Sequence, residues 1–198
     1  MFDWVLSTID HWGYGGIFLL MTVEHLFPPI PSEVIMPLAG YLAAQGKMNL
    51  MLVIAFGTAG SVLGTLFWYW VARAIGEERL KQLARRHGRL LTLSPGDIDA
   101  AHRWFDRYGR IAVFFGRMIP AIRTLISVPA GFARMRFSTF LIYTVLGSLI
   151  WTCFLTFAGL LLEAQYSRIE GYIDPISKAV VVIIVLAYIW RVIRWKPE

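Results

Sequence analysis

Ionisable side chains interrupt apolar sequence in two short segments. The first begins at Glu24, ends at Glu33 and contains Pro28, Pro29 and Pro31. An ionisable residue inside an apolar membrane segment costs about 2.5–3.5 kcal/mol on insertion scales, so its presence calls for a pairing or functional reason. Carboxylates in such surroundings are candidates for proton exchange. We therefore expect Glu24 and Glu33 to serve in proton exchange or coupling.

The second segment carries cations instead of carboxylates. It contains Arg117, Pro120 and Arg123 and continues to Gly131. The planar guanidinium group forms paired, charge-assisted hydrogen bonds with phosphate oxygens and stays charged at any relevant pH. The sequence therefore predicts that Arg117 and Arg123 bind the phosphate group of a substrate.

The two segments correspond to each other. When Pro29 is aligned with Pro120, Gly40 falls on Gly131. Each proline removes a backbone donor and clashes with the preceding helical turn, so we expect each segment to break into two short helical arms. Proline-interrupted apolar segments at equivalent places in two halves of a chain mark the substrate site of transporters built from inverted repeats.

The composition indicates a membrane protein. Of 198 residues, 57% are hydrophobic and only 16% are charged, and the mean hydropathy is positive. Residues 48–72 and 137–162 contain no charged side chain. Each stretch exceeds the roughly 20 residues that a helix needs to cross a hydrocarbon core of about 30 Å. A third apolar stretch covers residues 175–195.

We expect an all-α polytopic membrane protein, an inverted repeat of a re-entrant hairpin plus a transmembrane helix. One additional C-terminal transmembrane helix and a cytoplasmic amphipathic helical insert complete this single domain. The expected parts, in order, are an N-terminal lead (1–12), the first hairpin (13–45), a transmembrane helix (48–74), the basic insert (76–110), the second hairpin (111–133) and transmembrane helices at 137–162 and 175–195.

The distribution of charge predicts the orientation in the membrane. The net charge is +6, and 9 of the 19 Lys and Arg residues lie between residues 73 and 110. Residues 1–12 contain two aspartates and neither Lys nor Arg. Because basic residues flank membrane spans on the cytoplasmic side, we expect the insert and the C-terminus to be cytoplasmic and the N-terminus to lie outside.

Two amphipathic helices are expected within the insert. Leu80, Leu83 and Ala84 are spaced like one face of a helix, and this face should lie on the anionic membrane surface. Ser94 is a good N-cap for the second helix, which should end at Gly109. No nucleic-acid-binding motif accompanies the basic residues, and we expect no nucleic-acid partner.

Small residues line the first charge-free stretch. Gly57, Gly60 and Gly64 form a stripe that is suited to close helix contacts. We expect this stripe to pack within the chain rather than to form a substrate groove. The glycine-rich faces of 48–72 and 137–162 also permit a homodimer.

Three interpretations of the four buried charges remain open. The carboxylates and guanidinium groups can neutralise one another and simply join the two hairpins. Alternatively, Glu24 lies at the lipid interface because its hairpin is shallow. In the third interpretation both hairpin tips meet near the middle of the bilayer, where the arginines bind an anionic head group and the carboxylates exchange protons.

The sequence lacks the motifs of several enzyme classes. It has no H-E-x-x-H zinc motif and no G-x-S-G-type intramembrane serine site. Cys153 is the only cysteine, and His25, next to the prolines, is expected to be a packed or interfacial residue. We therefore expect no enzymatic activity, no cofactor and no metal.

The two segments resemble the DedA family, the bacterial branch of the VTT-domain membrane proteins. The similarity covers roughly residues 10–165. The matching residues are Glu24, Pro28, Pro29, Ile30, Pro31, Ser32, Glu33, Pro37, Leu38, Ala39, Gly40, Gly116, Arg117, Pro120, Arg123, Thr124, Ala130, Gly131, Phe137, Gly147 and Trp151.

This resemblance implies two re-entrant hairpins and a role in moving lipids across the bacterial cytoplasmic membrane. Bacterial members are implicated in returning undecaprenyl phosphate to the cytoplasmic face, and others in moving phosphatidylethanolamine or scrambling lipids. The family's essential acids and arginines correspond to Glu24 and Glu33 and to Arg117 and Arg123. The expected partners are membrane lipids and protons. The alternatives are a proton-coupled cation or drug antiporter and a structural assembly factor.

Overall fold

The computed structural model describes residues 2–26, 32–91, 94–120 and 122–161, and all regular secondary structure in these ranges is helical. The helices are α1 (Phe2–Trp12), α2 (Tyr14–Leu26), α3 (Ser32–Ala44), α4 (Leu50–Leu91), α5 (Pro95–Gly116), α6 (Ser127–Phe132) and α7 (Phe137–Leu161). The expected helix break at Pro28, Pro29 and Pro31 and the expected transmembrane helix at 175–195 lie outside the described residues.

Two helices are long and apolar enough to cross a membrane. They are the Leu50–Arg85 part of α4 and the whole of α7. Both charge-free stretches of the sequence fall on these helices, apart from their first or last residues. The prediction of an all-helical fold is confirmed for the described residues, and the length and apolar composition of these two helices fit a helical membrane protein.

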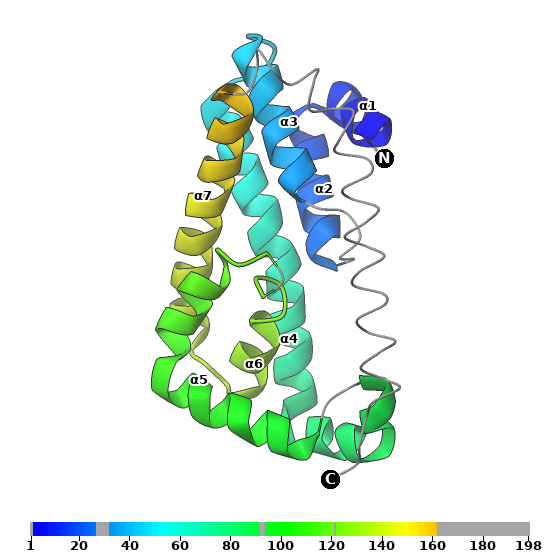
Figure 1. Ribbon diagram of the computed structural model, residues 1–198, viewed down its shortest axis with the longest axis vertical. Coiled ribbons are helices and arrows are strands. Elements are labelled where there is room, and N and C mark those ends of the chain that lie inside the picture. The colour runs from blue at the N-terminus through cyan, green and yellow to red at the C-terminus, as the bar shows by residue number, and fades with distance from the viewer. Residues whose placement is uncertain (1, 27–31, 92–93, 121, 162–198) are drawn as a thin grey trace.

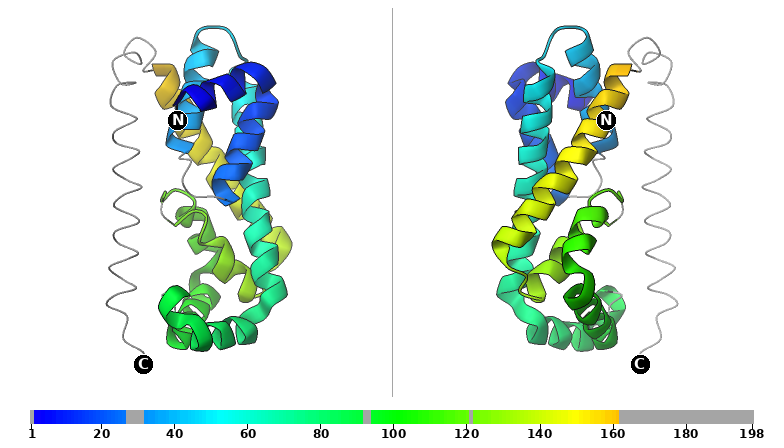
Figure 2. Two further views of the ribbon diagram at one scale, coloured as in Figure 1. Left: turned by 90° about the vertical axis from the view of Figure 1, so that its right-hand side faces the viewer. Right: turned by 90° about the vertical axis from the view of Figure 1, so that its left-hand side faces the viewer.

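The two long helices form the frame of the molecule. α4 and α7 contact each other and run in opposite directions along the long axis (Figures 1 and 2). The helices α1, α2 and α3 lie around one end of this frame, and α5 and α6 lie around the other end. The short helices of each half therefore meet near the middle of the frame.

In each half, one short helix packs against the long helix of the other half: α3 against α7, and α6 against α4. A β-carbon added to Gly40 of α3 would lie 2.1 Å from the carbonyl oxygen of Thr156 in α7. The equivalent Gly131 of α6 would place its β-carbon 2.4 Å from the carbonyl oxygen of Tyr69 in α4. Gly40 and Gly131, which the sequence alignment pairs, therefore have the same role in the two halves. Each allows a close backbone contact between two helices that a side chain would prevent.

Each half also packs another helix against its own long helix: α2 against α4, and α5 against α7. A β-carbon at Gly60 of α4 would lie 2.3 Å from the carbonyl oxygen of Phe18 in α2, and one at Gly147 of α7 would lie 2.9 Å from that of Phe114 in α5. The prediction that the glycine stripe packs within the chain is confirmed. These glycines are covered by other helices of the same chain.

α4 continues past the first membrane-spanning part as one helix, but it changes direction there. Gly76 has a φ of +73° within α4, a value that an ordinary helical residue does not adopt. Beyond this point Leu80 and Ala84 pack against a cluster that contains Ile98 and Phe132, whereas Leu83 is exposed. The expected apolar face therefore covers α5 and α6 for the most part, instead of lying wholly on the membrane surface.

The next helix begins as predicted and ends later than predicted. Ser94 caps α5, since its side chain accepts from the Asp97 amide while the Asp97 carboxylate accepts from the Ser94 amide. The expected end at Gly109 is wrong, because α5 continues to Gly116. A glycine inside a helix costs about 1 kcal/mol, and burial of Ala112 and Val113 in the core outweighs that cost. The first six residues of the expected second hairpin, 111–116, thus belong to the same helix as the end of the insert.

The glycine contacts generate a stability prediction. In Gly159→Ala the new β-carbon would lie 2.0 Å from the carbonyl oxygen of Pro37 in α3. We expect α3 and α7 to separate slightly, with a loss of about 1–3 kcal/mol in the free energy of unfolding. Thermal unfolding in detergent measures the change.

The matched control is Gly15→Ala in α2, where nothing lies within 4 Å of the added β-carbon and φ is not positive. This variant should unfold at the wild-type temperature or slightly above it, because alanine favours the helix. Equal destabilisation by both substitutions would contradict the close contact between α3 and α7.

Candidate functional site

The four predicted ionisable residues come together where the two halves meet. Glu24 lies in the last turn of α2 and Glu33 in the first turn of α3. Arg117 follows the end of α5, and Arg123 lies in the turns between α5 and α6. Pro120 also lies in these turns, so the second segment is broken where the sequence predicts.

Glu24 and Arg123 form a buried ion pair between the halves. The Arg123 Nη2 atom donates to Glu24 Oε1, and the two side chains are 5% and 6% exposed. Glu33 Oε1 lies 4.0 Å from the same Nη2 atom, but the Glu33 side chain is 37% exposed. The protein encloses Glu24, so this side chain is not exposed on the surface of the molecule.

Arg117 is buried without a carboxylate partner among the described residues. Its Nη1 atom donates to the carbonyl oxygen of Arg123, and its Nη2 atom donates to Ser127 Oγ at 3.0 Å and Thr144 Oγ1 at 3.2 Å. The guanidinium carbon lies 5.6 Å from the centre of the Phe140 ring. The side chain is therefore held in place by neutral groups, and its charge is not neutralised within the described part of the chain.

The pairing interpretation accounts for one arginine and not for the other. A buried cation without a counter-ion is costly, and the penalty remains several kcal/mol after the protein relaxes. The Nε atom of Arg117 is buried and has no hydrogen-bond partner within the described residues. An anion that enters beside Arg117 would find an oriented charge and a free donor.

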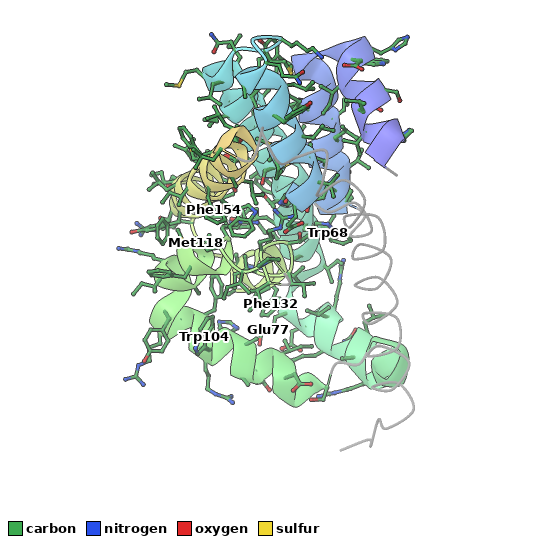
Figure 3. The ribbon with its side chains drawn as sticks, turned by 45° about the horizontal axis from the view of Figure 1, so that its top comes forward. Trp68, Glu77, Trp104, Met118, Phe132 and Phe154 are labelled. Atoms are coloured by element: carbon green, nitrogen blue, oxygen red, sulfur yellow. The ribbon has the colours of Figure 1, made fainter. Side chains whose placement is uncertain are left out.

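A histidine that the sequence analysis did not place in the site lies inside it. His25 is 1% exposed, so the expectation of a packed residue is confirmed. Its Nδ1 atom lies 2.9 Å from Glu24 Oε2, and its Nε2 atom lies 3.1 Å from Ser61 Oγ in α4. Trp68, labelled in Figure 3 near the end of α2, donates from its indole nitrogen to the carbonyl oxygen of His25 at 2.8 Å.

Hydroxyl groups on the long helices complete the surroundings of the charges. Thr144, Ser148, Thr152 and Thr156 follow one another at every fourth residue of α7, and all four are buried. That spacing places them on one helix face. The spacing was available in the sequence as a sign of a polar face, although nothing local connected it to the arginines. Within the described residues, no group of three or more His, Cys, Asp or Glu side chains is arranged to hold a metal ion.

Comparison with known proteins identifies the family. A family model described as the VTT domain matches residues 30–161. The chain belongs to the VTT-domain family. The match includes Glu33, Arg117 and Arg123, and the resemblance to the DedA family is thereby confirmed.

The relatives of this VTT-domain chain carry different names. Undecaprenyl phosphate transporter A of Staphylococcus aureus is 34% identical over 96% of this chain and 94% of its own length. An alkaline phosphatase-like protein of Lactococcus lactis subsp. lactis is 40% identical over 96% of this chain and 89% of its own length. Protein DedA of Escherichia coli is 23% identical over 93% of this chain and 84% of its own length. No solved structure matches the chain.

Substitution of the two arginines should affect stability differently, because within the described residues only Arg123 contacts a buried carboxylate. Arg123→Met leaves Glu24 buried without its partner, and we expect a loss of about 3–5 kcal/mol in the free energy of unfolding. Arg117→Met removes an uncompensated charge along with its hydrogen bonds, and we expect a change within about 1 kcal/mol. Thermal unfolding of the purified protein in detergent compares the two variants.

The double variant Glu24→Gln/Arg123→Met serves as the control for charge, since it leaves neither side chain of the pair charged. It should recover most of the stability that Arg123→Met loses. If Arg117→Met proves as damaging as Arg123→Met, Arg117 must have a negatively charged partner and the distinction between the arginines fails.

Proposed function

We propose that this protein moves a phosphate-bearing lipid across the bacterial cytoplasmic membrane, and that undecaprenyl phosphate is its substrate. The observation that carries the proposal is the buried guanidinium group of Arg117, which has no carboxylate partner among the described residues. A substrate phosphate supplies the missing counter-ion. Phosphate suits the site because guanidinium groups bind its oxygens in pairs.

The names of two relatives support a polyprenyl-phosphate substrate. The Staphylococcus aureus and Bacillus subtilis proteins named undecaprenyl phosphate transporter A are 34% and 32% identical to this chain over most of its length. The Lactococcus lactis name also concerns phosphate chemistry. We propose transport without catalysis.

The proposed arrangement in the membrane places the site between two re-entrant hairpins. The first hairpin consists of α2 and α3, and the second consists of the end of α5 together with α6. Each arm of the first hairpin has 13 residues, which corresponds to about 20 Å and is too short for a core of about 30 Å. We propose that the first hairpin enters from outside and the second from the cytoplasm, with the N-terminus outside and residues 76–110 cytoplasmic.

Proton exchange at the carboxylates would couple to phosphate binding through Arg123. While Glu24 is ionised, it holds Arg123 in the buried pair. Protonation of Glu24 would remove that attraction and free the guanidinium group for a second set of phosphate contacts. Glu33, which is partly exposed and 4.0 Å from Arg123, is the second group that we propose to exchange protons.

Lipid translocation in proteoliposomes tests the function. Undecaprenyl phosphate and phosphatidylethanolamine are compared for the wild type, for Arg117→Met and for Glu24→Gln/Arg123→Gln, which lacks the buried pair and leaves no unpaired charge of that pair behind. We expect wild-type vesicles to move undecaprenyl phosphate faster than empty vesicles, and both variants to lose tenfold or more of that rate, about 1.4 kcal/mol or more.

Arg110→Ala is the matched control, because Arg110 is an exposed arginine on α5 outside the site. It should translocate lipid at the wild-type rate. Equal movement of phosphatidylethanolamine would favour a general phospholipid scramblase. Movement of neither lipid, together with proton release driven by a cation or drug, would favour the antiporter.

A charge exchange separates the phosphate site from a purely structural ion pair. Glu24→Arg/Arg123→Glu keeps one positive and one negative side chain in contact. A structural pair would survive this exchange with activity intact. A phosphate site would not, since the exchange moves the guanidinium group from the second half to the first.

A further inference from the structure

A pocket lies where α4 changes direction, apart from the buried charges between the two halves. It has a volume of about 500 Å³. Residues 73–79 of α4 line it together with His102 of α5 and residues 132–134 at the end of α6. Two of these lining residues, Glu77 and Phe132, are labelled in Figure 3. The four ionisable residues of the candidate functional site do not line this pocket.

Three arginines from two distant parts of the chain line the pocket. Arg73 and Arg79 lie on either side of Gly76, whose φ of +73° turns the helix. In a straight helix, side chains six positions apart would project about 120° away from each other. The turn at Gly76 brings both to the same pocket. Arg134 reaches it from the turn that follows α6.

Arg73 is held beside the turn that carries Arg134. Its Nη1 atom donates to the Tyr69 hydroxyl at 2.8 Å and to the carbonyl oxygen of Met135 at 3.2 Å. Its guanidinium carbon lies 5.9 Å from the centre of the Trp70 ring. The Nε and Nη2 atoms form no hydrogen bond with the described residues. The guanidinium group is therefore fixed in place, and its other donors can bind a ligand.

Arg134 occupies a backbone position that usually belongs to glycine. The Met135 amide donates to the Ala130 carbonyl oxygen at 3.1 Å, and the Arg134 amide donates to the Gly131 carbonyl oxygen at 3.0 Å. This pair of bonds is the Schellman motif, which places Arg134 at the C′ position of α6. Its φ is +51°, and within the described ranges every other residue with a positive φ is a glycine.

The corresponding turn in the first half uses glycine. α3 also ends in a Schellman motif, in which the Lys47 amide donates to the Leu42 carbonyl oxygen and the Gly46 amide donates to that of Ala43. Gly46 is the C′ residue and has a φ of +72°. The turn itself therefore does not require an arginine, and positive-φ outliers such as Arg134 cluster at ligand sites.

The unpaired groups of the lining carry an excess of positive charge. Glu77 already contacts Lys81 at 2.7 Å and His102 at 2.5 Å. Glu78 is exposed, and neither it nor any of the three arginines forms an ion pair with a described residue. Three guanidinium groups thus face one unpaired carboxylate. A phosphate monoester, which carries about −1.5 to −2 charges near pH 7, matches this excess.

The pocket lies at the level of lipid phosphates in the topology proposed above. Arg73 directly follows the charge-free stretch 48–72, and Arg134 precedes the charge-free stretch 137–162 by three residues. Both arginines therefore mark the cytoplasmic edge of the hydrocarbon core, where head groups lie. Basic pockets between membrane helices on this side suit anionic head groups.

We propose that this pocket binds the phosphate monoester head group of a lipid from the cytoplasmic leaflet. Arg73, Arg79 and Arg134 donate to its oxygens, as guanidinium groups do in phosphate sites. The site goes beyond the function proposed above. It uses none of the residues assigned to transport, and it shares only the topology with that proposal.

Photolabelling locates the lipid directly. The full chain is placed in phosphatidylcholine nanodiscs that contain a small fraction of phosphatidic acid with a photoreactive group beside its phosphate. After illumination, mass spectrometry measures the label on each peptide. We expect the label to concentrate on peptides that contain residues 73–79 and 132–134, and unlabelled phosphatidic acid to displace it. Label confined to other peptides overturns the site.

Arg79→Gln and Arg134→Gly each remove one guanidinium group from the pocket. We expect the label on the pocket peptides to fall by about tenfold or more, because each variant loses charge-assisted hydrogen bonds. Arg134→Gly should unfold at the wild-type temperature or above it, since glycine adopts a positive φ freely. Its loss of label therefore cannot come from unfolding. Full labelling in both variants overturns the proposal.

Arg136→Gln is the matched control, because Arg136 is exposed, lies two residues beyond Arg134 and does not line the pocket. It removes the same charge and should label like the wild type. If it loses as much label as Arg134→Gly, net charge explains the binding and the pocket is overturned.

Competition identifies the class of ligand. Phosphatidic acid should displace the label more effectively than phosphatidylglycerol, whose phosphodiester carries one negative charge. Equal displacement by phosphatidylglycerol overturns the choice of a monoester, and equal displacement by inorganic phosphate overturns the choice of a lipid. Labelling requires no transport. If wild-type vesicles move no lipid, the proposed function fails, and the label on the pocket peptides still decides this site.

Discussion

The buried pair of Glu24 and Arg123 is the interaction on which the meeting of the two halves depends. It joins the end of α2 to the turns between α5 and α6, and both side chains are almost completely enclosed. Burying either charge alone costs several kcal/mol, which only the opposite charge in contact can offset. The halves are therefore stable together only in the arrangement that brings these two side chains into contact.

Close packing of glycine makes that arrangement accessible. Gly40 brings α3 against α7, and Gly131 brings α6 against α4, so each half is completed by the long helix of the other half. These two contacts bury backbone atoms of both α3 and α6. It also carries the polar residues of α7, such as Thr144, to the arginine that follows α5.

The two arginines have different electrostatic environments although they lie six residues apart. Arg123 is neutralised by Glu24, whereas Arg117 is held by a carbonyl oxygen, hydroxyls and an aromatic ring. A site with an oriented and uncompensated cation is poor for stability and well suited to an anionic ligand, as is common where function opposes stability. His25 lies beside the carboxylate that neutralises Arg123, and it contacts the Ser61 hydroxyl of α4.

Sequence alone determined the features that depend on neighbouring residues. Hydropathy located both long helices, and Ser94 located the start of α5. Pro120 located the break between α5 and α6, and glycines located the close helix contacts. The expected helix end at Gly109 failed because burial elsewhere on α5 outweighed a local preference. Only the tertiary structure decided that Glu24 pairs with Arg123, that Arg117 has no acidic partner among the described residues and that His25 touches Glu24. Pairing across 99 residues depends on how helices pack, and local propensities carry no information about such distances.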